Sequence, residues 1–126
     1  KVMMFFQSSI LIQTLALTML EHRQVFLEHA AGVCARREEL YAAMRRIEGL
    51  RVWPSHTNFL LFSVGILSPI LNRHLQENDI AVRDVGANPF LAGCLRVTVS
   101  SDDDNSAFLH CVQDFMKSSI KRSNRA

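Results

Sequence analysis

Two long helical patterns begin the chain. From Ser8 to about Leu20 the apolar residues recur every three or four positions, which predicts an amphipathic helix that Ser8 or Ser9 can cap. A second and longer pattern covers residues 23–48. It ends at Gly49, because a glycine adopts the left-handed conformation that closes many helices without straining a Cβ.

The longer helix is expected to bury one face and expose the other. Its predicted inner face holds the apolar residues Phe26, Ala30, Val33, Leu40, Met44 and Ile47. Its predicted outer face holds the charged residues Arg36, Arg37, Glu38 and Glu39, which we expect to be solvated.

After Gly49 the pattern changes to extended and then alternates between strands and helices. Residues 50–53 and 57–62 favour two strands, and residues 80–83 and 94–99 favour two more, separated by an irregular loop. Ser68 and Pro69 predict the N-cap and first turn of a helix between the strand pairs. Ser101 predicts the cap of a last helix, whose apolar stripe consists of Phe108, Val112, Phe115 and Met116.

This order of elements predicts an α+β fold, with long N-terminal helices packed on a small, largely antiparallel sheet. The chain has 126 residues, which fits one domain, and its 48% hydrophobic content excludes a disordered chain. A net charge of +2 is too small for a surface that follows nucleic-acid phosphates. Polar residues interrupt the apolar start before the roughly 20 residues needed to span a bilayer, so we expect neither nucleic acid nor membrane as a partner.

Most catalytic signatures are missing from the sequence. It contains no Gly-rich phosphate loop, nucleophile elbow or metal-binding helix motif. Cys34, Cys94 and Cys111 are an odd number at wide spacing, which predicts neither a disulfide framework nor a zinc site, and no metal ligand set is expected. The lysines are Lys1, Lys117 and Lys121, so no central lysine is available to form a Schiff base.

Two arginines lie in or beside predicted strands. Arg83 ends one strand, and Arg96 lies inside another between Leu95 and Val97. A guanidinium among apolar strand residues needs an anion or water, and its planar fork fits a carboxylate or a phosphate. The alternatives are a salt bridge with Asp84 or an exposed strand face.

Four segments together carry a family resemblance: residues 37–41, 54–62, 80–86 and 93–99. In this order and spacing they resemble the C-terminal part of a histidinol-phosphate aminotransferase, of the fold-type-I aminotransferases that depend on pyridoxal phosphate. The resemblance extends from about Ser8 to Phe115, and its most specific feature is the pair of strand motifs that carry Arg83 and Arg96. Ser100 departs from the family, which often has glycine there.

The resemblance implies roles for three residues. Arg96 would bind the substrate α-carboxylate, and Arg83 would lie near the substrate phosphate. Asn58 belongs to an Asn-Phe segment near the substrate entrance, although an asparagine there often only ties a loop to the backbone. No catalytic or cofactor-binding residue is expected in this chain.

The resemblance also implies a division of the chain and of the work. Residues 1–22 would form a lead-in helix that packs on a large domain, residues 23–118 the aminotransferase small domain, and residues 119–126 a basic tail. The complete enzyme would be a cytoplasmic homodimer that acts on small amino-acid and phosphorylated substrates. It would use pyridoxal 5′-phosphate held by its large domain, so we expect this chain alone to bind no cofactor and to be inactive.

Two other functions stay open at this point. One is a related enzyme, such as a threonine-phosphate decarboxylase or another amino-acid aminotransferase. The other is a non-catalytic α+β module for binding or oligomerisation.

Overall fold

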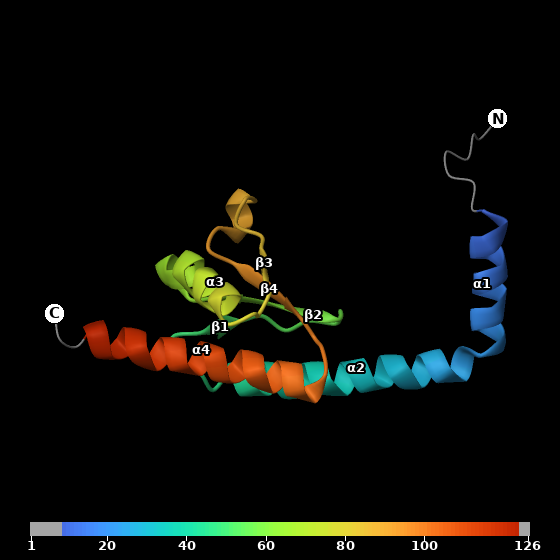
Figure 1. Ribbon diagram of the computed structural model, residues 1–126, viewed down its shortest axis with the longest axis horizontal. Helices are drawn as coiled ribbons and strands as arrows, with labels where there is room; N and C mark the ends of the chain where they lie inside the picture. Colours follow the sequence, from blue (N-terminus) through green and yellow to red (C-terminus); the bar gives the residue numbers. More distant parts are fainter. Residues whose placement is uncertain (1–8, 124–126) are drawn as a thin grey trace. The chain divides into compact units, whose positions relative to one another are not determined.

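The structure is a computed structural model that describes residues 9–123, with side chains described through residue 119. Its helices and strands follow the predicted order and confirm the α+β class (Figure 1). They are α1 (Ile10–Glu21), α2 (Arg23–Met44), β1 (Arg51–Val52), β2 (Phe59–Ser63), α3 (Ser68–Glu77), β3 (Arg83–Asp84), β4 (Leu95–Thr98) and α4 (Asp102–Ser123). Two short 3-10 turns, η1 (Gly65–Leu67) and η2 (Pro89–Leu91), precede α3 and β4. Ser8 and residues 124–126 of the predicted basic tail lie outside the described residues.

The chain divides into two compact units between Gly32 and Val33, inside α2. In the first unit Ser9 caps α1, because its Oγ accepts a hydrogen bond from the backbone N of Ile12 at 3.4 Å. Most large apolar side chains of this unit are exposed, among them Ile10, Leu11, Ile12, Leu15, Leu17, Leu20, Val25 and Leu27. The predicted inner face is wrong for Phe26, which is 44% exposed, and for Ala30, which is also exposed.

The second unit is built on an antiparallel sheet with the strand order β1-β2-β4-β3. Because side chains alternate along a strand, each strand presents every second residue to the same face. On one face Leu60, Phe62, Leu95 and Val97 are buried, so that face is the core side of the sheet. The other face, which we call the open face, carries Arg51, Phe59, Leu61, Ser63, Arg83, Arg96 and Thr98, all exposed or half-buried.

Three helices supply the other half of the core. Buried side chains come from the end of α2 (Leu40, Met44), from α3 (Leu71, Leu75) and from α4 (Phe108, Val112, Met116). The rings of Phe62 and Phe108 meet edge to face at 5.6 Å between centroids. Figure 1 shows α4 running along the sheet with α3 beside it, and η2 at the far tip of the β3–β4 connection. The helices thus cover the core side of the sheet.

Helix α2 is shorter than predicted and one of its charged residues is buried. It ends at Met44 rather than Glu48, because Arg46 and Ile47 donate to carbonyls three residues back and turn Ile47 into the core. Gly49 has the expected left-handed backbone, at φ +78°. Arg37 is only 7% exposed. Its buried guanidinium is satisfied because it donates to Glu38 at 2.7 Å and to the backbone oxygen of Thr57 at 3.2 Å.

Two further boundaries differ from the prediction. Ser68 is the first residue of α3 rather than its cap, and its hydroxyl accepts a hydrogen bond from the backbone N of Val64 at 3.1 Å. The third strand begins at Arg83 rather than Ile80. The backbone N of Ile80 donates to Leu75 at 2.9 Å, which keeps this segment beside the end of α3 and out of the sheet.

Candidate functional site

The two arginines predicted from the sequence stand opposite each other on adjacent strands. In the β3–β4 register Arg83 pairs with Arg96, so both side chains lie on the open face of the sheet. Directly paired residues of antiparallel strands have Cβ atoms about 5 Å apart. The two arginine side chains therefore extend from neighbouring backbone positions on the same face of the sheet.

Neither guanidinium has a carboxylate partner. Within the part of the chain that the structure describes, the ion pairs are Arg37–Glu38 and Lys117–Asp114. The carboxylate of Asp84, the partner considered for Arg83, instead accepts a hydrogen bond from the backbone N of Gly86 at 2.7 Å. The salt-bridge alternative is therefore not the arrangement found, and both arginines are free to meet an external anion.

Arg96 is half-buried and is held by an aromatic ring. Its Nε is shielded from solvent and has no hydrogen-bond partner. Its guanidinium carbon lies 4.8 Å from the centroid of the Phe59 ring, in a cation–π arrangement. A second such pair lies on the same sheet, where the guanidinium carbon of Arg51 is 4.7 Å from the Trp53 ring.

The open face as a whole is positively charged. Its strand positions include Arg51, Arg83 and Arg96 but no carboxylate, and the remaining positions are aromatic, aliphatic or hydroxylated. It offers no nucleophile paired with a base. Such a surface can bind and orient an anionic group.

Asn58 lies apart from the two arginines. It comes just before β2, its side chain is exposed, and its backbone oxygen accepts a hydrogen bond from Val99 at 2.9 Å. In the register of β2 and β4 it falls beyond the Phe59–Thr98 pair, whereas Arg96 pairs with Leu61. The structure therefore joins Arg83 and Arg96 into one surface and leaves Asn58 at the end of the strand.

Sequence reasoning missed Phe59 as a neighbour of Arg96, and it missed the separate Arg51–Trp53 pair, whose strand β1 is separated from β4 by β2. The alternation in residues 57–62 already places Phe59 and Leu61 on one face. Only the register of β2 with β4, however, shows that this is the face of Arg96.

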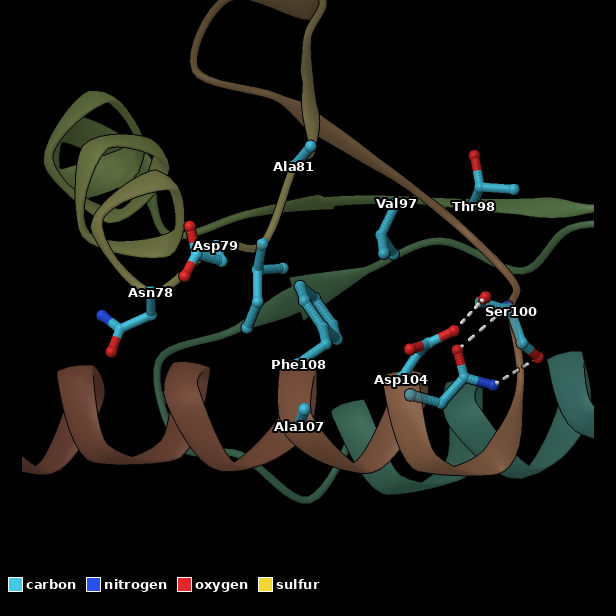
Figure 2. Close-up of a pocket in the computed structure, with 11 residues that line it drawn as sticks. Asn78, Asp79, Ala81, Val97, Thr98, Ser100, Asp104, Ala107 and Phe108 are labelled. Carbon is cyan, nitrogen blue, oxygen red and sulfur yellow. Dashed lines mark hydrogen bonds between the residues drawn. The ribbon is translucent and has the colours of Figure 1, made fainter.

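Apart from the open face, a hollow of about 420 Å³ lies between the end of α3, β4 and the first turns of α4 (Figure 2). Three of its polar residues, Ser100, Asp104 and Asn105, are joined by hydrogen bonds. The hydroxyl of Ser100 donates to Asp104 at 2.6 Å, and the Asn105 side chain bonds the backbone N and O of Ser100 at 3.1 and 3.2 Å. Hydrogen bonds from Ser100 and then Ser101 lower the pKa of Asp104 below its ordinary value. This network caps α4, and a glycine at position 100 would remove its hydroxyl.

Among the described side chains, no residue fits the anchoring of an aldehyde cofactor. Lys117, the one lysine with a described side chain, projects from α4 and is 71% exposed, with its Nζ 3.8 Å from Asp114. It belongs to a helix on the core side of the sheet, away from the open face. The described residues also contain no cluster of three metal-ligating side chains and no helix long and apolar enough to span a membrane.

Sequence comparison finds clear relatives, although no family model matches the chain. The chain is 36% identical over 98 residues to the histidinol-phosphate aminotransferase of Aquifex aeolicus, and 38% identical over 107 residues to that of Acidovorax sp. strain JS42. These matches cover 78% and 83% of this chain but 28% and 29% of the relatives. The chain thus spans less than a third of the length of the curated relatives it matches.

Comparison with solved structures identifies the same fold. A Burkholderia pseudomallei protein assigned as an aminotransferase matches 79% of this chain with a TM-score of 0.71 and 26% identity, over 30% of its own length. The L-threonine-O-3-phosphate decarboxylase of Porphyromonas gingivalis matches 69% of this chain with a TM-score of 0.64, over 28% of its own length. At 22% identity the second match shows a shared fold alone.

Proposed function

We propose that this chain, which is homologous over most of its length to the C-terminal part of histidinol-phosphate aminotransferases, supplies the substrate-binding small domain of such an enzyme. The complete enzyme would transfer an amino group between glutamate and imidazole-acetol phosphate, as the relatives' name implies. The observation that carries the proposal is the Arg83–Arg96 pair on a face without carboxylates.

The two arginines would divide the anionic groups of the substrates between them. Arg96 would orient the α-carboxylate of glutamate, because its half-buried guanidinium is held in place and its planar fork matches a carboxylate. Arg83 would contact the substrate phosphate from the exposed edge strand. Asn58 would add at most a contact at the rim, since it lies beyond the strand pair that carries Arg96.

The role of this chain would be recognition rather than chemistry. In an enzyme of this family pyridoxal 5′-phosphate supplies the electron sink for amino transfer. The described residues of this chain do not fit that cofactor, because Lys117 lies outside the open face. The cofactor would therefore be held by the part of the enzyme that the relatives have and this chain does not span.

We propose that the chain consists of three segments, which match this division between substrate recognition and cofactor binding. Residues 23–118 would be the small domain, and residues 119–126 a basic tail. Residues 1–22 would be a lead-in helix that covers its apolar surface with the large domain. This last assignment is supported by the exposure of Leu11, Leu15 and Leu20, since large contiguous apolar surfaces are uncommon on monomeric proteins.

A chimera tests the proposal. This chain replaces the homologous C-terminal part of the Aquifex aeolicus enzyme, and turnover is measured with histidinol phosphate and with threonine phosphate. Activity on histidinol phosphate that falls in Arg83→Gln supports the proposal. The matched control is Arg73→Gln, which removes the same charge from an exposed position on α3 and should leave turnover unchanged.

Other results would favour the other functions. Decarboxylation of threonine phosphate by the chimera would assign the related enzyme instead. A folded chimera with no activity on either substrate, beside an active parent enzyme, would favour a non-catalytic module.

A further inference from the structure

The contact between Arg96 and Phe59 carries an inference about how the anion-binding surface is kept in order. The guanidinium carbon of Arg96 is 4.8 Å from the ring centroid, and the Nε of Arg96 is shielded without a hydrogen-bond partner. Leaving a polar N–H unsatisfied is unfavourable, so some other interaction must hold the guanidinium there. The electron-rich face of Phe59 provides one.

Phe59 does not serve the hydrophobic core. The core includes Leu60 and Phe62, its neighbours on the opposite side of the strand, and the residues packed against that core do not include Phe59. It is a large aromatic residue on the open face, where it is half-buried. Its ring contacts the charged guanidinium of Arg96.

The backbone of Phe59 and of the residue before it is fixed by hydrogen bonds, and this positions the ring. Phe59 pairs with Thr98 in the β2–β4 register, and its backbone N donates to Thr57 Oγ1 at 3.4 Å. The preceding residue is tied to β4 through the 2.9 Å hydrogen bond from Val99 to Asn58. Phe59 is therefore a diagonal neighbour of Arg96, a position from which an aromatic side chain reaches across the strands.

Repulsion makes such a support necessary. Arg83 begins directly opposite Arg96 and carries the same charge, which would push two flexible side chains apart in the absence of an anion. A ring face beneath one guanidinium limits its rotamers without using its hydrogen-bond donors. Those donors then stay available for a ligand.

We propose that Phe59 is a positioning residue, which holds the Arg96 guanidinium ready to receive a carboxylate oxygen. This inference rests on the proposed anion-binding role of Arg96, and its test separates the two. It assigns to Phe59 a role in ligand affinity and none in the stability of the core.

The test follows the side-chain Nε–Hε signals of the arginines by NMR in the full 126-residue chain, with glutamate, whose α-carboxylate is assigned to Arg96, as the probe. Arg96→Gln identifies the Arg96 signal by its loss. In the unsubstituted chain the ring current of Phe59 should move this signal away from those of the exposed arginines. Phe59→Leu should return it toward them and weaken glutamate binding about 5-fold, whereas Phe59→Trp should keep both properties, since tryptophan is the best cation–π partner.

Trp53→Leu is the matched control, because it removes the ring of the other arginine pair on the same sheet. It should move the Arg51 signal and leave the Arg96 signal and the glutamate affinity unchanged. If Phe59→Leu does not fold, Phe59→Met serves as the variant without a ring.

The outcomes separate the two proposals. Glutamate affinity that is the same in Phe59→Leu and the unsubstituted chain, with or without a shift of the Arg96 signal, overturns the positioning role and leaves the anion site standing. Affinity that is unchanged in Arg96→Gln overturns the anion site itself, and with it the role of Phe59. Loss of affinity in both Phe59→Leu and Phe59→Trp shows that the ring does not act through its π face, which also overturns the inference.

Discussion

Arg83 lies directly opposite Arg96 across the β3–β4 pair, and no described carboxylate neutralises either residue. Like charges in directly paired positions of a sheet destabilise it. A chain that keeps two such residues side by side accepts a cost in the unliganded state that a bound anion would remove. The pair is therefore better explained by binding than by folding.

The first prediction concerns this cost. Arg83→Gln should increase the free energy of unfolding by about 0.5 kcal/mol at low ionic strength, because it removes one of two opposed charges. The gain should shrink as salt screens the repulsion of the unsubstituted chain. Urea denaturation at low and high salt measures both effects. Arg73→Gln serves as the control, and an equal effect of the two substitutions would contradict the repulsion between Arg83 and Arg96.

The second prediction separates the two faces of β2. Phe62 is fully buried against Phe108, so Phe62→Ala should lower the free energy of unfolding by about 3–5 kcal/mol. Phe59 lies on the open face, and Phe59→Ala should cost less than about 1.5 kcal/mol. Chemical denaturation of both variants tests the assignment. Equal losses would mean that the open face is packed like the core side.

The third prediction concerns pH and Ser100. Hydrogen bonds from Ser100 and Ser101 lower the pKa of Asp104 in the folded chain, so its ionised form stabilises the fold above its ordinary pKa. That contribution is lost as the pH falls through the folded-state pKa. Ser100→Ala should therefore raise the pKa of Asp104 and reduce stability at neutral pH, and it should have little effect once Asp104 is protonated in both forms.

Carboxyl carbon NMR of Asp104 and denaturation at several pH values check this prediction. Ser118→Ala is the control, because its hydroxyl bonds the backbone of Asp114 within the same helix and leaves Asp104 untouched. A pKa of Asp104 that stays lowered in Ser100→Ala would show that Ser101 or the start of the helix controls it.

The local signals in the sequence predicted much of the fold. Periodicity and turn chemistry placed the α4 cap at Ser101, whose Oγ accepts from the backbone N of Asp104, and the left-handed turn at Gly49. The helix cap and the left-handed turn depend on residues that are close along the chain, and a sequence shows such neighbours directly. For the same reason the order of elements and the α+β class were predictable.

Features that depend on distant partners were not predictable in the same way. Arg37 was expected in solvent, because no local pattern shows that the carbonyl of Thr57 and the carboxylate of Glu38 satisfy its guanidinium. Arg83 and Arg96 were identified as candidates, but only the register of β3 with β4 makes them face each other. A shift of one residue would have put them on opposite faces of the sheet.

The most direct test of the account is the steady-state kinetics of the Aquifex aeolicus chimera with glutamate as the amino donor. We expect Arg96→Gln to lower kcat/KM for glutamate about 30-fold, which corresponds to the roughly 2 kcal/mol of a hydrogen bond to a charged group. The same kcat/KM for glutamate in the Arg96→Gln and unsubstituted chimeras would contradict it.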